Sequence, residues 1–193
     1  MDSLVFATNN NNKIIEIKKI LPPKYKILSL DDINCNVDIP ENQDTIEKNS
    51  IQKAQFIYDK YKLNCFADDT GLETEALNNE PGVFSARYAG ENKDFEANID
   101  KLLEKLEGIT NRKARFLTVI SLFYNGQLYL FKGIVNGQIL NHRRGTGGFG
   151  YDSVFQPEGY IKTFAEMTTN EKNSISHRGI AVNSLIKFLE SVK

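Results

Sequence analysis

Hydrophobic positions at the start of the chain change from a strand-like run to a helical spacing. Residues 4–7 form a short apolar run that predicts a buried strand. Ile14, Ile17 and Leu21 then recur at the spacing of one helix face, which predicts a helix. The two prolines at residues 22–23 end this helix, because proline removes a backbone donor and clashes with the preceding turn. The pattern therefore predicts a strand, a polar turn and a helix.

Two more helices and a strand are expected in the middle of the chain. Asp44 and Glu47 have the spacing of a capping box ahead of an apolar stripe with helical period. The short apolar segment 64–67 after this helix predicts a second buried strand. A third helix is expected to begin at Asp94 and to end at Gly108, since glycine is common just after helix ends.

The hydrophobic period changes in the second half of the chain. Residues 114–124 and 127–135 are rich in β-branched and aromatic side chains, which favour strands. Asn125 and Gly126 between them are a strong signal for a type I′ hairpin, so these two strands should pair antiparallel. A final helix is expected with Ser176 as its N-cap. Together the elements predict an α/β protein.

Composition limits the classes of function. With 193 residues, 40% of them hydrophobic, the chain can bury one sizeable core, so we expect a single domain over residues 1–193. The net charge of -1, without a long basic block, argues against direct nucleic-acid binding, and no apolar stretch approaches a membrane span. Cys35 and Cys65 suggest neither a disulfide framework nor a metal cluster, so we expect a reducing, cytoplasmic setting.

Two adjacent acids, Asp68 and Asp69, are the strongest chemical signal. We expect them to emerge at the carboxyl end of the strand at 64–67, where open α/β sheets collect ligands. Successive side chains on an extended chain point to opposite sides, so one acid is free to hold a divalent cation while the other takes a proton from water. The alternative is that residues 68–71 form only a polar turn.

The polar segment 8–13 between the first strand and the first helix is suited to an anion. Its backbone donors, side-chain amides and Lys13 have the chemistry to bind a phosphate group. The alternative is an asparagine-rich turn with a solvated lysine. The segment lacks the glycine pattern of a P-loop, which argues against a kinase or ATPase of that class.

Glycines at 145–150 satisfy the dinucleotide fingerprint, but we expect a strand at 151–155 after them, and that fingerprint requires a helix. The glycines still allow a flat ligand close to the backbone, with Phe149 or Tyr151 available to stack on a base. A merely flexible loop is the alternative.

His177 and Arg178 bring several donors to the start of the last helix, although a capped, solvated helix end explains them equally well.

Five ordered motifs together resemble the inosine/xanthosine triphosphate pyrophosphatase family. This resemblance implies an elongated mixed central sheet flanked by helices, with two lobes and a nucleotide cleft between them. It also implies a Mg²⁺-dependent hydrolase, usually a homodimer, that converts ITP, dITP and XTP to the monophosphate and pyrophosphate and so keeps them out of the pool for DNA and RNA synthesis. The motifs lie at residues 6–13, 66–73, 81–90, 147–152 and, as the fifth, 163–168 with 176–178.

The resemblance also assigns roles to individual residues. Asp69 is implied as general base, and Glu41 and Asp69 as ligands of Mg²⁺. His177 and Arg178 are implied as readers of the 6-oxo edge of the purine. The remaining residues implied to contact the nucleoside triphosphate are Thr8, Asn9, Asn10, Asn11, Asn12, Lys13, Lys53, Asp68, Thr70, Phe149, Gly150, Tyr151, Asp152 and Lys172.

The chain departs from the family pattern in the second helix, where Lys48, Asn49 and Ser50 stand in place of the usual Glu-Asn-Ala. An acid is thus replaced by a cation near the expected metal site. Three other functions stay open from the sequence: a related pyrophosphatase for pyrimidine triphosphates, a nucleotide sensor without turnover, and an NTPase that releases phosphate.

Overall fold

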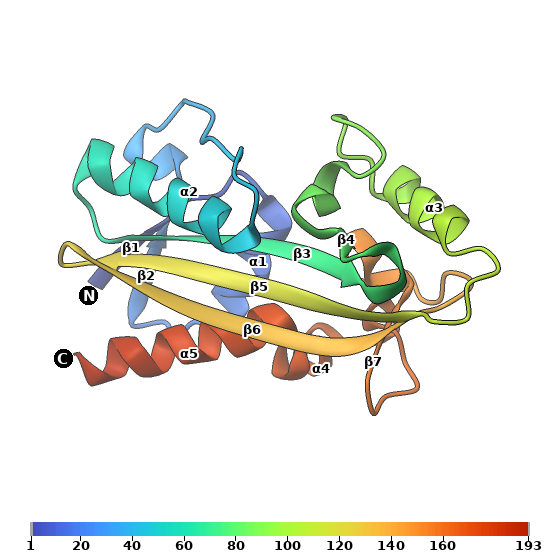
Figure 1. Ribbon diagram of the computed structural model, residues 1–193. Coiled ribbons are helices and arrows are strands. Elements are labelled where there is room, and N and C mark those ends of the chain that lie inside the picture. The colour runs from blue at the N-terminus through green and yellow to red at the C-terminus, as the bar shows by residue number, and fades with distance from the viewer. Residues whose placement is uncertain (1, 193) are drawn as a thin grey trace. The chain divides into compact units, whose positions relative to one another are not determined.

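The computed structural model of the protein describes residues 2–192, and these form a seven-stranded sheet with the order β2-β1-β3-β5-β6-β7 and β4 paired to β3 (Figure 1). β1 runs parallel to β2 and β3, whereas β4 is antiparallel to β3 and β7 to β6, so the sheet is mixed as predicted. The strands are β1 Asp2–Phe6, β2 Tyr25–Leu28, β3 Cys65–Thr74, β4 Glu80–Pro81, β5 Lys113–Tyr124, β6 Gln127–Ile139 and β7 Phe155–Pro157.

Five α-helices and five short 3₁₀ helices connect these strands within residues 2–192. None of the helices in this part of the chain is long and apolar enough to cross a membrane. The α-helices are α1 Asn11–Ile20, α2 Ile46–Tyr61, α3 Phe95–Lys105, α4 Thr169–Ile175 and α5 His177–Ser191. The 3₁₀ helices are η1 Asp31–Ile33, η2 Glu75–Leu77, η3 Gly82–Arg87, η4 Gly150–Ser153 and η5 Phe164–Glu166.

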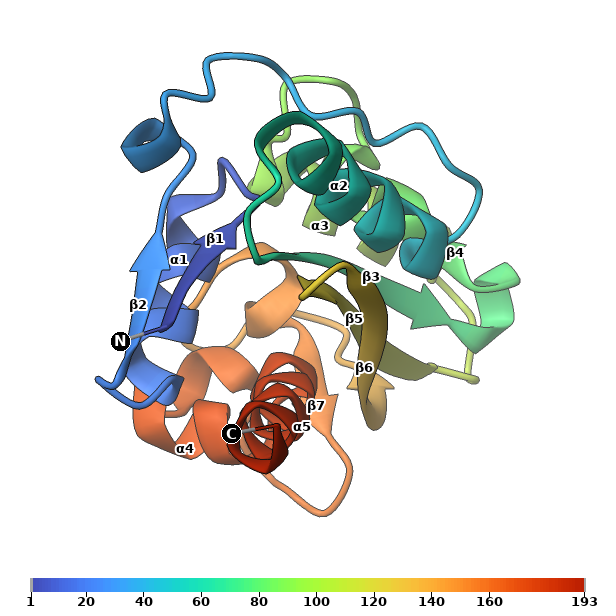
Figure 2. The same ribbon diagram turned by 90° about the vertical axis from the view of Figure 1, so that its left-hand side faces the viewer.

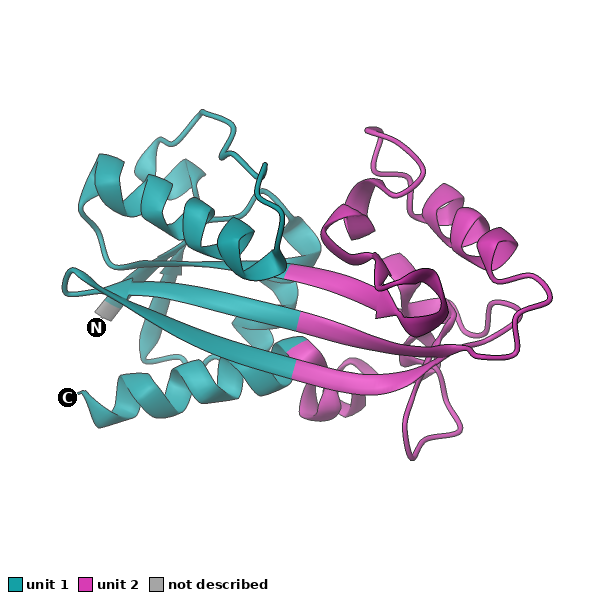
Figure 3. Cartoon of the chain, in the orientation of Figure 1, with its two compact units in different colours: residues 1–69, 118–133, 178–193 teal, residues 70–117, 134–177 magenta. Residues whose placement is uncertain are grey.

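The chain divides into two compact units (Figure 3). Unit 1 consists of residues 1–69, 118–133 and 178–193, and unit 2 of residues 70–117 and 134–177. Strands β3, β5 and β6 each contribute residues to both units. The single functional domain and the cleft expected from the sequence stay predictions.

Unit 1 buries the two faces of its sheet under different helices, α1 and α5 on one face and α2 on the other (Figure 2). The alternation of side chains along β1 separates the two cores: Leu4 and Phe6 pack with α1 and α5, whereas Val5 packs with α2. Phe6 stacks on Phe66 of β3 with ring centroids 4.5 Å apart. This packing fixes the ends of β1 and β3 to each other, because β1 and β3 are also hydrogen-bonded neighbours.

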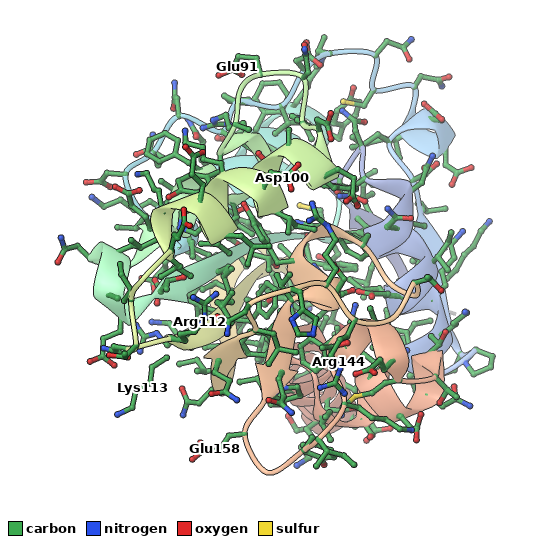
Figure 4. The ribbon with its side chains drawn as sticks, turned by 90° about the vertical axis from the view of Figure 1, so that its right-hand side faces the viewer. Glu91, Asp100, Arg112, Lys113, Arg144 and Glu158 are labelled. Atoms are coloured by element: carbon green, nitrogen blue, oxygen red, sulfur yellow. The ribbon has the colours of Figure 1, made fainter. Side chains whose placement is uncertain are left out.

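Unit 2 has its own core, in which α3, β5, β7 and the 3₁₀ helices η4 and η5 pack together. Arg112, labelled in Figure 4, contacts the backbone near the ends of α3 and β6. Its guanidinium donates to the carbonyl oxygens of Ile139 at 2.6 Å, Leu106 at 3.0 Å and Leu140 at 2.9 Å. These bonds connect the end of α3 to the end of β6.

The predicted helices and the hairpin are confirmed, although α3 ends at Lys105 and not at Gly108, and one N-cap differs. The N-cap role of Ser176, which directly precedes α5, stays a prediction. Asn125 and Gly126 have φ values of 49° and 83°, as a type I′ turn requires. Asp94 is the N-cap of α3. The N-cap of α2, however, is Thr45 and not Asp44, because the Thr45 hydroxyl accepts from the backbone N–H of Lys48. Asp44 instead pairs with the Lys48 ammonium at 2.8 Å.

Two strand predictions are wrong. The strand expected at 64–67 continues to Thr74, because it also pairs with β5 and, at Glu73 and Thr74, with β4. Residues 68–71 are therefore strand and not a polar turn, and the acids lie beyond the carboxyl end of β1 but within β3. The strand expected at 151–155 is mostly the 3₁₀ helix η4, since an Asp152 carboxylate oxygen accepts from the backbone N–H of Phe149 at 2.8 Å.

Candidate active site

The side chains of Asp68 and Asp69 point to opposite faces of the sheet, as those of neighbouring residues on a strand do. The Asp68 carboxylate contacts Lys13 of α1 and Arg178 of α5 on one face. The Asp69 carboxylate lies 3.5 Å from the Lys53 ammonium of α2 on the other face. The two acids thus have different partners, which fits the expectation that they have separate tasks.

Asp68 is fully buried, yet it is held in its charged form. Burial by itself would raise the pKa of this carboxyl group, but Lys13, Arg178 and Lys53 together hold the pKa well below its usual range. One Asp68 oxygen lies 3.0 Å from the Lys13 ammonium and the other 3.3 Å from Nε of Arg178. A second carboxylate, Glu16 of α1, also contacts the Arg178 guanidinium. Buried charge is therefore paired throughout this group.

Asp69 has the opposite electrostatic behaviour. Burial raises the pKa of its carboxyl group, and the nearby charges of Lys53 and Lys13 reduce this effect without cancelling it. For Lys53, burial alone would lower the pKa, but Asp69, Glu41 and Asp68 raise it above its usual value. The Lys53 ammonium therefore stays charged between two carboxylates, since it also contacts Glu41. We call Lys13, Glu41, Lys53, Asp68 and Asp69 the charged cluster.

Glu41 and Asp69 have the chemistry expected of ligands for Mg²⁺. They approach the same ammonium group, and the side chain of Glu41 is 35% exposed, so a cation has access to it. Mg²⁺ typically takes one or two carboxylates and completes its octahedral shell with water and phosphate oxygens. Among residues 2–192, no group of three or more His, Cys, Asp or Glu side chains that could hold a metal ion occurs.

The segment 8–13 leads into α1 as predicted, although its residues 11–13 are already the first turn of the helix. Asn10 is the N-cap, and its side-chain oxygen accepts from the backbone N–H groups of Asn12 at 3.0 Å and Lys13 at 3.3 Å. The Thr8 hydroxyl accepts from the backbone N–H of Asn10 at 3.2 Å. Asn9, Asn11 and Asn12 are exposed on this turn. The start of α1 thus presents amide groups to solvent beside Lys13, whose pKa is lowered chiefly by burial.

In unit 2, a second group combines one buried ion pair with aromatic rings. The ammonium of Lys172, on α4, lies 2.7 Å from the Asp152 carboxylate, and both residues are buried. The same ammonium lies over the rings of Phe149, at 5.1 Å from the centroid, and Phe164, at 5.7 Å. We call Phe149, Asp152, Phe164 and Lys172 the aromatic cluster.

Gly148 makes the position of Asp152 possible. It has a φ of +72°, and a Cβ added there would lie 2.0 Å from an Asp152 carboxylate oxygen. The glycine therefore allows the close approach that the aromatic cluster needs. Gly150 follows with a φ of +61° and begins η4.

The other predicted residues of unit 2 lie in buried surroundings. The Tyr151 hydroxyl donates to the carbonyl oxygen of Ser85 at 2.9 Å, and burial raises the pKa of this phenol. The His177 ring stacks on Phe116 with centroids 4.4 Å apart. Thr70 is half-buried in β3, directly after Asp69.

Within unit 1 the structure brings predicted residues together in the charged cluster, and within unit 2 it brings others together in the aromatic cluster. It also adds residues that sequence reasoning missed. Glu16 lies one helical turn after Lys13, a spacing that places both on one side of α1, so the sequence did contain a signal. Ser50 donates from its hydroxyl to the carbonyl oxygen of Ala67 at 3.2 Å, and only the departure from the family pattern pointed to it.

The chain is similar to known proteins in both sequence and structure. A model of the Ham1 family matches residues 4–188. A dITP/XTP pyrophosphatase of Flavobacterium johnsoniae is 56% identical over 190 residues, covering 98% of this chain and 99% of that protein. A dITP/XTP pyrophosphatase of Porphyromonas gingivalis is 52% identical over 194 residues, covering 100% of each.

Solved structures agree and confirm the α/β fold class. The Ham1 protein of Staphylococcus aureus has a TM-score of 0.91 at 42% identity, with 100% of both chains covered. A HAM1 protein from Coxiella burnetii has the same TM-score at 37% identity, with 99% of this chain and 100% of that chain covered. The family match spans nearly the whole chain, and the resemblance inferred from its motifs is confirmed: the chain belongs to the Ham1 family.

Proposed function

We propose that the chain is a pyrophosphatase that hydrolyses non-standard purine nucleoside triphosphates, namely dITP, ITP and XTP, to the monophosphate and pyrophosphate. It would thereby keep these nucleotides out of DNA and RNA synthesis. The observation that carries the proposal is the charged cluster, in which Glu41 and Asp69 share the Lys53 ammonium. Relatives at 52% and 56% identity are dITP/XTP pyrophosphatases, which supports the choice of substrate.

In the proposed reaction, water attacks the α-phosphorus and the bond from that phosphorus to the bridging oxygen breaks. Asp69 accepts the proton of the attacking water. Pyrophosphate leaves with the electron pair of the broken bond. No covalent bond to the protein is formed.

Charge on the phosphates has to be balanced during this reaction. Lys13 and Lys53 would stabilise the negative charge that grows on the leaving pyrophosphate, because both ammonium groups lie beside the acids of the cluster. We propose that Glu41 and Asp69 hold Mg²⁺, which when bound neutralises phosphate charge and lowers the pKa of water. The exposed amides of Asn9, Asn11 and Asn12 at the start of α1 would bind the phosphate tail.

We propose that residues 149–152 contact the base and that Lys172 is a further substrate contact, with His177 and Arg178 reading the 6-oxo edge of the base. Donors directed at a 6-oxo group match hypoxanthine and xanthine but meet the 6-amino donor of adenine. A buried donor left without a partner costs about 1 to 3 kcal/mol, which is roughly tenfold discrimination or more. Arg178 also contacts Asp68 and Glu16, so it would connect base recognition to the charged cluster.

Product identity tests the proposal. Purified protein with Mg²⁺ is incubated with dITP, ITP, XTP, GTP, ATP, dTTP and UTP, and pyrophosphate is assayed separately from phosphate. Pyrophosphate mainly from dITP, ITP and XTP is the expected result. Pyrophosphate mainly from dTTP and UTP would overturn the base assignment, and phosphate release or no turnover would overturn the reaction.

We further propose that the protein acts as a cytoplasmic homodimer. The mass of one chain is 21.9 kDa, so light scattering on a size-exclusion column should give about twice that value. A mass near 21.9 kDa at assay concentration would contradict the dimer.

A further inference from the structure

The loop that carries Glu41 depends on side chains of α2 for its position. Residues 40–45 before α2 form neither strand nor helix. The backbone N–H of Asn42 donates to the side-chain oxygen of Gln52 at 3.2 Å, and the backbone N–H of Gln43 donates to that of Asn49 at 2.9 Å. The Gln52 amide nitrogen in turn donates to the Asn42 side-chain oxygen at 2.7 Å. Three hydrogen bonds therefore attach this short loop to one helix.

The same face of α2 carries the lysine of the charged cluster. Asn49, Gln52 and Lys53 are three to four residues apart or adjacent, so they project from one side of the helix. Lys53 contacts both Glu41 from the loop and Asp69 from β3. Helix α2 thus sets the position of Glu41 in two ways. Its side chains accept hydrogen bonds from the backbone of residues 42 and 43, and its Lys53 contacts the Glu41 carboxylate.

Strand β3, which carries Asp69, is bonded to the same helix, α2. The buried Ser50 hydroxyl donates to the carbonyl oxygen of Ala67, two residues before Asp69. Helix α2 is therefore bonded to both segments that supply the carboxylates. Since the reacting groups of an enzyme tolerate displacements of only a fraction of an ångström, attachment of both segments to one rigid element has a functional consequence.

We propose that Asn49 and Gln52 are positioning residues, which hold Glu41 beside Asp69 so that the two carboxylates bind one divalent cation. The inference rests on the proposed function and deepens it. Asn49 and Gln52 do not touch substrate or metal in this scheme. They act through the backbone of residues 42 and 43. Loss of outer partners of metal ligands typically costs about 10- to 100-fold in metal affinity or activity, which sets the expected size of the effect.

The test compares Gln52→Ala with Gln55→Ala. Both glutamines lie on α2, and within residues 2–192 the Gln55 side chain makes no hydrogen bond. The control therefore makes the same substitution on the same helix without removing a hydrogen bond. Gln52→Ala should raise the Mg²⁺ concentration for half-maximal turnover about tenfold, with an unchanged melting temperature. Gln55→Ala should behave like the unmodified protein.

Hydrogen exchange supplies a readout without turnover. In Gln52→Ala the backbone amide of Asn42 should lose protection, and in Asn49→Ala that of Gln43. Asn49→Asp keeps an oxygen for the Gln43 N–H, so it should restore that protection and the Mg²⁺ dependence. Equal Mg²⁺ dependence for Gln52→Ala and Gln55→Ala, or unchanged exchange at both amides, would overturn the inference.

Failure of the proposed function is distinguishable from failure of this inference. If the unmodified protein releases no pyrophosphate, the proposed function fails. The positioning role is then decided by amide exchange and by the affinity for Mn²⁺ in the presence of a non-hydrolysable dITP analogue. An affinity that falls in Gln52→Ala but not in Gln55→Ala supports the inference, and equal affinities contradict it.

Discussion

The charged cluster of unit 1 and the aromatic cluster of unit 2 both contain buried charged side chains, but these side chains have different kinds of partner. In the charged cluster, Lys13 contacts Asp68, whose pKa is lowered, and Lys53 contacts Asp69, whose pKa is raised. In the aromatic cluster, one buried ion pair is covered by rings. The first arrangement suits proton transfer and phosphate charge, whereas the second suits a flat, polar-edged ligand.

The comparison predicts that the two clusters fail in different ways. Asp69→Asn removes the proposed base while it keeps the shape of the side chain, so kcat should fall by about 100- to 10,000-fold. The melting temperature should change little, because the contact of the Asp69 carboxylate with the Lys53 ammonium is long, at 3.5 Å. Steady-state kinetics with dITP measure the effect. Asp59→Asn on the exposed side of α2 is the matched control, and equal activity of the two variants would contradict the role of Asp69.

In unit 2 the largest expected effect is on stability. Lys172→Met leaves the buried Asp152 carboxylate without its ion-pair partner, which should lower the free energy of unfolding by about 3 to 5 kcal/mol. Urea denaturation measures this. Lys24→Met is the control, since Lys24 pairs with Glu190 on the surface and its loss should leave stability unchanged. Similar stabilities for both variants would show that the aromatic cluster does not depend on its ion pair.

Arg178 sharpens the comparison, because it contacts the acids of unit 1 and is also proposed to read the base. Arg178→Lys retains a positive charge but loses the planar fork of donors. The ratio of kcat/KM for dITP over dATP should fall roughly tenfold. An equal loss for both nucleotides would show that Arg178 acts only through Asp68 and Glu16 and has no role in base recognition.

Cys65 is a buried ionisable group without an oppositely charged partner, and the expected effect of replacing it on stability is the smallest of those predicted. Burial raises the pKa of its thiol to about 12. A group whose pKa is raised in the folded state contributes stability that is present below its unfolded pKa and is lost as the pH rises toward the folded value. The free energy of unfolding should therefore fall more steeply between about pH 9 and 12 in the unmodified protein than in Cys65→Ala. Parallel curves would contradict this.

Elements with strong local patterns could be predicted from the sequence. Asp94 ahead of α3 and the turn at Asn125 and Gly126 are set by neighbouring residues, so local reasoning found them. The length of β3 depends on pairing with β5 and β4, which no local pattern reveals. For this reason the acids were predicted at the end of a strand, although the strand continues past them.

The candidate site was predicted in part for a similar reason. The motifs identified Asp68 and Asp69 as a pair, and alternation along a strand predicted their separate directions. The partner of Asp68, Arg178, lies 110 residues away, and its pairing with Glu16 spans 162 residues. Such contacts depend on the tertiary packing of α1 and α5, so the sequence alone could not assign them.

The central claim is that water attacks the α-phosphorus with Asp69 as base, and the oxygen isotope of water tests it most directly. The protein is incubated with dITP in water enriched in oxygen-18, and both products are analysed by mass spectrometry. The account predicts one labelled oxygen in the nucleoside monophosphate and none in the pyrophosphate. Label in the pyrophosphate, or in free phosphate, would contradict it.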